Sequence, residues 1–127
     1  MKLNAPTMQN GVVKSGEFSY TRKSRTLKAY GEEFVIPVKT VELGDKLDEI
    51  GAELAEAKIT SDVIHVTKKG IALFIGEEAT EKLYPEEKFN ELDVDEVIEF
   101  WSALNFELNR AQNERLARYA AAKAIRR

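Results

Sequence analysis

Residues 93–123 constrain the fold most, because this stretch is long and contains neither Gly nor Pro. At about 100° per residue, its large apolar side chains fall on one face, as in an amphipathic helix. They are Val97, Phe100, Trp101, Leu104, Leu108, Ala111 and Tyr119. Asp93, with Glu96 three residues later, predicts the start of the helix, because these carboxylates can satisfy free amides of the first turn. We therefore predict one long helix here.

Phe106 does not fit the apolar face of this helix. It points nearly opposite Val97, so a helix that buries Val97 leaves the Phe106 ring on the other side. Such a ring either marks a contact surface for a second copy or another protein, or is covered by a hairpin nearer the N-terminus. The candidate partner-binding residues are Phe106, Phe100, Arg110 and Tyr119.

A short β-hairpin is predicted ahead of the helices. Residues 27–30 and 34–38 flank Gly31-Glu32-Glu33, and Gly31 can supply the backbone conformation of the turn. Pro37 cannot donate a hydrogen bond to a sheet, so it should lie at an edge. Two strands alone are marginally stable in water, so a helix or another chain must cover one face.

Residues 41–58 predict an amphipathic helix, in which Gly51 lies close to the apolar face and suggests a close approach of another helix. Residues 62–75 are compatible with two strands joined through Lys69-Gly70 or with one helix capped by Ser61 or Asp62 and ended by Gly76. We favour the helix. A short helix over 77–83 and a loop over 85–92 should then lead into the long helix.

The expected fold is therefore mainly α, of the α+β type. A small N-terminal β-hairpin packs on a bundle of about four helices that includes the long C-terminal helix. At 127 residues, the chain suits a single domain over 27–127, whose C-terminal end frays or extends into a partner. Residues 1–26 form a flexible basic arm in this prediction, and the alternating segment 17–23 within it could form a short strand.

Charge is distributed unevenly along the chain. Residues 1–30 carry six basic side chains and one acidic side chain, and residues 110–127 carry the same numbers, a net charge of +5 for each. Residues 31–109 carry twenty acidic side chains and seven lysines, a net charge of -13. The cationic ends could fold back onto the acidic middle or bind an anionic partner. A small regulatory protein that binds nucleic acid through its basic termini is thus one hypothesis, although the acidic middle would repel phosphates.

The sequence contains few residues or motifs that could serve catalysis, metal binding or cofactor binding. There is no Cys and only one His, His65, and no HExxH, GxGxxG, GxxxxGK[ST] or GxSxG motif occurs. The acidic clusters resemble solvated helix starts. We therefore expect a non-enzymatic protein without cofactors, in a reducing cytoplasm. No run of about eighteen apolar residues occurs, so a membrane location is not expected either.

The segment IALFIGEEATEKLYP, residues 71–85, carries a resemblance to a known family. In its order of hairpin, helices and long final helix, the chain resembles the tail assembly chaperones of long-tailed bacteriophages and prophages over about residues 27–115. The resemblance implies a small, mostly helical protein in the cytoplasm of a bacterial host. Such a protein self-associates and coats the tape measure protein until tail tube protein replaces it. A longer frameshifted product is common in this family, which has no fixed functional residues to assign here.

Overall fold

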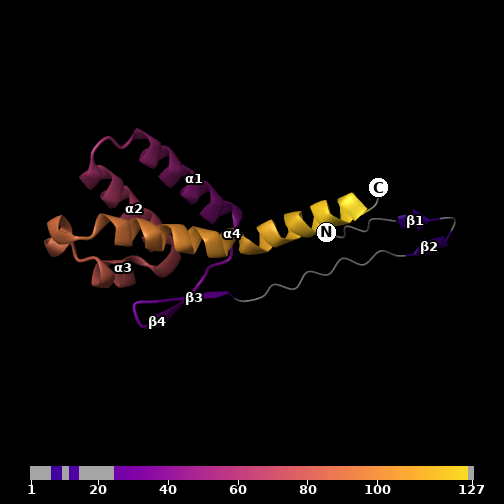
Figure 1. Cartoon of the computed structure of the whole chain (residues 1–127), viewed down its shortest axis with the longest axis horizontal. Coiled ribbons are helices and arrows are strands. Elements are labelled where there is room, and N and C mark those ends of the chain that lie inside the picture. Colours follow the sequence, from indigo (N-terminus) through magenta and orange to yellow (C-terminus); the bar gives the residue numbers. More distant parts are fainter. Residues whose placement is uncertain (1–6, 10–11, 15–24, 126–127) are drawn as a thin grey trace.

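The computed structural model describes residues 7–9, 12–14 and 25–125, with side chains from Arg25 to Arg110 and at Glu114 and Ala117. The elements are β1 (Thr7–Gln9), β2 (Val12–Lys14), β3 (Thr26–Ala29), β4 (Glu32–Val35), α1 (Val41–Glu56), α2 (Thr60–Ile75), α3 (Glu77–Leu83), the 3-10 helix η1 (Glu86–Glu91) and α4 (Val94–Ile125). The protein is mainly α with a small β-hairpin, β3–β4, as predicted (Figure 1). A second hairpin, β1–β2, lies within the predicted arm and was not predicted.

The long helix α4 is the element against which the others are arranged. It begins as predicted, because the amide of Glu96 donates a hydrogen bond of 3.2 Å to Oδ1 of Asp93. Its N-terminal half packs against α2 and β3, and its C-terminal part continues past the other helices (Figure 1). At 1.5 Å per residue, its 32 residues extend over about 48 Å.

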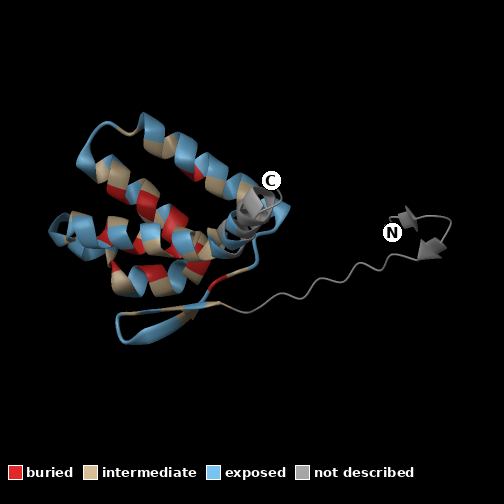
Figure 2. Ribbon diagram, turned by 45° about the vertical axis from the view of Figure 1, so that its right-hand side comes forward, coloured by how far each residue is buried: buried red, intermediate tan, exposed pale blue. Residues whose placement is uncertain are grey.

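The hydrophobic core lies where α2, α3, α4 and the β3–β4 hairpin meet (Figure 2). Leu104 and Val97 from α4 are 0% and 1% exposed, and Ile71 from α2 is 0% exposed. The other buried members are Ile36, Ile64, Phe74, Tyr84 and Phe100. Helix α1 packs on α2 and buries Ile50.

The segment left open between helix and strands is the helix α2. It begins at Thr60, and its N-cap is Ile59, which makes no side-chain cap hydrogen bond. The predicted caps at Ser61 and Asp62 are therefore wrong by two and three residues. Gly76 ends it with a φ of 93°, a conformation that suits glycine. Helix α3 occupies the predicted residues, and η1 fills most of the predicted loop.

The close approach between helices occurs at Gly70 and not at Gly51. A Cβ atom added to Gly51 would have nothing within 4 Å. At Gly70 it would lie 2.6 Å from Cη2 of Trp101, so the ring of Trp101 occupies the space that a side chain would need. Trp101 also packs edge-on against Phe74, with 6.0 Å between the ring centroids. The expectation for Gly51 is therefore wrong.

The β3–β4 hairpin turns through Tyr30 and Gly31, whose φ angles of 56° and 73° are those of a two-residue type I′ turn. Leu27 pairs with Phe34, and the amide of Ile36 donates a hydrogen bond of 2.8 Å to the carbonyl of Arg25. The strands are thus shifted from the predicted 27–30 and 34–38.

Much of the predicted basic arm, residues 1–26, lies outside the described residues. Its described parts are Arg25, Thr26 and the strands β1 and β2, which pair antiparallel with Met8 opposite Val13. The alternating segment 17–23 lies outside the described residues, as do residues 126 and 127.

Candidate partner-binding surface

Phe106 lies on the face of α4 that points away from the core, and 60% of its surface is exposed. The same face carries three other exposed residues at helical spacing from Phe106, namely Glu99, Ser102 and Arg110. The opposite face carries Leu104, which is fully buried. The β3–β4 hairpin does not cover Phe106. The exposure that the helical periodicity predicts is therefore present, and the role of Phe106 in binding stays a prediction.

Phe100 belongs to the core and not to this surface. Only 5% of it is exposed, and its ring packs edge-on against Tyr30 and Phe34, with centroids 5.4 and 5.7 Å away. Its place among the candidate partner-binding residues needs correction, because the hairpin covers the edge of the apolar face on which Phe100 lies. The side chain of Tyr119 lies outside the described residues, so its proposed contact stays a prediction.

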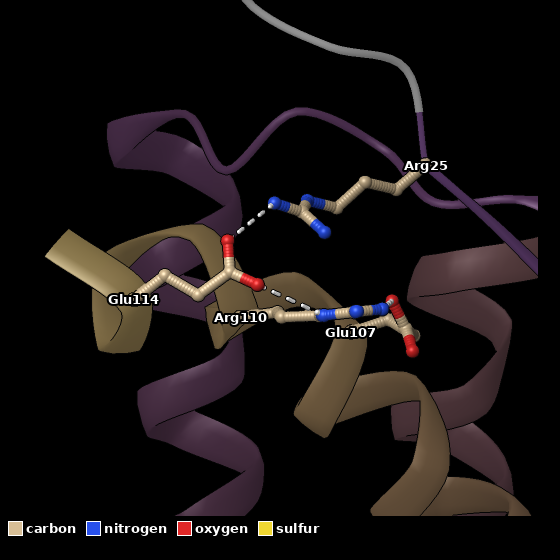
Figure 3. Close-up of polar contacts among 4 residues, drawn as sticks. All are labelled: Arg25, Glu107, Arg110 and Glu114. Atoms are coloured by element: carbon tan, nitrogen blue, oxygen red, sulfur yellow. Dashed lines mark hydrogen bonds and ion pairs between the residues drawn. The ribbon is translucent and has the colours of Figure 1, made fainter. Parts of the chain in front are cut away.

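Arg110 lies one helical turn after Phe106 and is held between two carboxylates (Figure 3). Its Nε donates to Oε2 of Glu114 at 3.2 Å, and its Nη1 lies 3.5 Å from Oε1 of Glu107. Glu114 also lies 3.8 Å from Nη2 of Arg25, at the base of the hairpin (Figure 3). Such exposed pairs contribute at most about 1 kcal/mol each. They compensate the charge of Arg110, so the surface beside Phe106 is not a cationic patch.

His65 forms a separate cluster, away from Phe106, between α2 and η1. Its ring stacks on Phe89 with 3.9 Å between centroids, and its Nε2 lies 3.5 Å from a carboxylate oxygen of Glu86. Nζ of Lys68 lies 3.8 Å from the other oxygen of Glu86. The imidazole is half exposed, which agrees with a structural surface residue. Among the described residues, no group of three or more His, Asp or Glu is placed to hold a metal ion.

Tyr30 and Tyr84 form a partly buried polar contact, with their hydroxyl oxygens 2.6 Å apart. The contact ties the hairpin turn to the end of α3. Tyr84 is 1% exposed, and burial raises its pKa well above the ordinary value, with the hydrogen bond to Tyr30 adding to the effect. Burial also raises the pKa of Tyr30. Both phenols therefore stay protonated at neutral pH and act as hydrogen-bonding groups.

Several exposed apolar side chains were not singled out from the sequence. Val35 is 65% exposed, Val41 83% and Ile59 60%. For Val35 the sequence did contain a signal, because side chains alternate along a strand. Val35 therefore points to the face opposite that of the partly buried Phe34. Val41 and Ile59 lie at or beside helix starts, where periodicity says little about exposure.

Comparison of the chain with protein-family models, with characterised proteins and with solved structures finds no significant match. No helix in the described part of the chain is both long enough and apolar enough to cross a membrane.

Proposed function

We propose that this protein is a non-enzymatic tail assembly chaperone, which binds a phage tape measure protein and keeps it in solution until tail tube protein replaces it. The observation that carries the proposal is the 60% exposed ring of Phe106 on the outer face of a long helix. The resemblance of residues 71–85 to this class of chaperone supports it. A cytoplasmic, self-associating protein belongs to the same proposal.

The charge distribution suits this activity. A chaperone for a helical, apolar client needs exposed apolar helix surface for contact and a strongly charged surround for solubility and reversible release. Phe106 offers the first, and the net charge of -13 over residues 31–109 offers the second. Because Arg110 is paired with Glu107 and Glu114, an apolar client helix can approach Phe106 without leaving the charge of Arg110 uncompensated.

The test is co-purification with the client. We expect the client to be a long helical protein whose gene lies next to the gene of this chain. Phe106→Asp should reduce the recovered client about tenfold or more, because a carboxylate would have to be desolvated in the contact. Ala52→Asp, on the exposed side of α1, adds the same charge elsewhere and should leave recovery unchanged. Equal recovery with both variants would contradict binding through this face.

The competing hypothesis is a small nucleic-acid-binding regulatory protein that uses its basic ends. The contacts of Arg25 and Arg110 argue against nucleic-acid binding, because both arginines already pair with Glu114. A salt-dependent shift of DNA or RNA mobility that is lost when residues 1–24 or 116–127 are removed would favour this hypothesis over the chaperone.

A further inference from the structure

A line of exposed side chains runs along the outer face of α4 from Phe106 towards the start of the helix. Glu99 lies seven residues before Phe106, and Asp95 lies eleven residues before it. At about 100° per residue, both therefore lie within about 20° of Phe106 around the helix. Along the axis, Glu99 is about 10 Å and Asp95 about 16 Å from Phe106. The surface around Phe106 thus has two carboxylates at one end.

These two carboxylates have no cationic neighbour. Among the side chains that the structure describes, no ion pair is found for Asp95 or Glu99. At the other end of the line, Arg110 is neutralised by Glu107 and Glu114. The uncompensated charge on this face is therefore negative and lies towards the start of α4.

Asp95 and Glu99 also line a hollow of about 490 Å³ between the start of α4 and the turn of the β3–β4 hairpin. Tyr30 and Phe100 provide aromatic surface in this hollow, and Tyr30 is 41% exposed. The other lining residues are Ala29, Asp93 and Glu96. A Lys or Arg side chain that enters the hollow would meet carboxylates and an aromatic ring, which are both favourable contacts for a cation.

A wholly apolar helix would bind this face poorly. A helix that covers Phe106 and continues along α4 also covers Glu99, because the two side chains lie on one line. A carboxylate that loses water without gaining a partner is destabilised. A basic side chain at the matching position of the bound helix would give Glu99 an ion pair instead. Charge complementarity therefore selects a partner with basic side chains beside its apolar contact.

We propose that the client segment bound at Phe106 is an amphipathic helix with an apolar side chain opposite Phe106 and a Lys or Arg side chain seven residues away on the same face. The basic side chain pairs with Glu99 at the hollow, and a second one, eleven residues from the apolar side chain, faces Asp95. The spacing is that of α4, because two helices packed side by side have the same rise per residue. The pairing depends on the proposed function, since it concerns the same client and the same surface.

Charge reversal tests the ion pairs. The double variant Asp95→Lys with Glu99→Lys should lower the amount of client recovered by co-purification about tenfold or more, because two cations would then face the basic side chains of the client. Asp45→Lys with Glu49→Lys is the matched control, since it changes the same residue types at the same spacing at exposed positions of α1. The control should leave recovery unchanged. Both variants must keep the circular dichroism spectrum of the unmodified chain.

The single variant Glu99→Gln provides a milder test, because it removes one charge and keeps the size of the side chain. Client recovery by the unmodified chain should fall as the salt concentration rises from about 50 to 500 mM, since salt screens ion pairs. Glu99→Gln should show a shallower fall and a recovery about twofold to fivefold lower at low salt, as expected for the loss of one partly exposed pair.

Full recovery of the client with Glu99→Gln and with the charge-reversed variant, together with loss of the client in Phe106→Asp, would overturn the basic client segment and leave the proposed function intact. Full recovery with Phe106→Asp would contradict the proposed function itself. Sedimentation velocity of the same variants tests a second copy of the chain as the occupant. A charge-reversed variant that keeps its client but no longer self-associates would assign this face to a second copy and overturn the proposal.

Discussion

Alanine should have opposite effects at the two helical glycines Gly51 and Gly70. In a helix interior, Ala is favoured over Gly by about 1 kcal/mol. At Gly51 the added methyl group meets nothing within 4 Å, so the free energy of unfolding should rise by about this amount. At Gly70 the methyl group would lie 2.6 Å from Cη2 and 3.1 Å from Cε3 of Trp101. The ring must move within a packed site that includes Phe74, and overpacking of this kind costs about 1–3 kcal/mol.

The net change at Gly70 is therefore a loss of up to about 2 kcal/mol, which places the two variants about 1–3 kcal/mol apart. Urea unfolding, followed by far-ultraviolet circular dichroism and by the fluorescence of the single tryptophan, measures both values. Thermal unfolding should separate the variants by about 4 °C per kcal/mol.

The double variant Gly70→Ala with Trp101→Leu isolates the contact, because the cost of the methyl group should largely disappear once the ring is gone. Gly70→Ala that is as stable as Gly51→Ala, with unchanged tryptophan emission, would refute the argument. It would mean that Trp101 does not fill the space over Gly70.

Three further predictions concern α4 and the tyrosine pair. Leu104→Ala, at a fully buried site, should lower the free energy of unfolding by about 2–5 kcal/mol in urea. In the same assay, Phe106→Ala should change it by less than about 0.5 kcal/mol, which would contradict a purely structural role for that ring. Above about pH 10, the unfolded chain releases a tyrosyl proton that native Tyr84 keeps, because the native pKa is raised. Stability should be unaffected by this group below that pH and should fall as pH rises, by at most about 1.4 kcal/mol per pH unit. Tyr84→Phe should make this fall shallower in urea titrations from about pH 9 to 11, and an unchanged slope would show that Tyr84 ionises normally.

The structure shows what part of the cationic ends of the sequence contacts. Arg25 from the N-terminal end and Arg110 from the C-terminal end both pair with Glu114. These two arginines therefore meet carboxylates of the same chain. The acidic character of the middle of the chain remains on α1 and α3 and at a groove between β4 and α3, where Glu32, Glu78 and Glu81 are exposed.

The sequence by itself predicted the helices, although it left strands open for residues 62–75, and it predicted most of the helix ends and the place of Phe106 on the outer face of the long helix. Only the tertiary structure decided that the β3–β4 hairpin does not cover Phe106. The predicted features depend on local rules: helical periodicity of 3.6 residues, the cap at Asp93, and the positive φ that Gly31 and Gly76 can adopt. The short helix over 77–83 was predicted to the residue, because Gly76 and Pro85 bound it on both sides. Such local rules act within one element and do not depend on what the helix packs against.

Only the tertiary structure decided which residues of the apolar face stay accessible and which glycine is approached closely. Phe100 lies at the edge of that face and is covered by the hairpin, whereas Gly70 and not Gly51 faces Trp101. Tyr30 meets Tyr84 across 54 residues of sequence. Such contacts depend on how separate elements dock, and the spacing of residues within one element does not encode the angle or the register of docking.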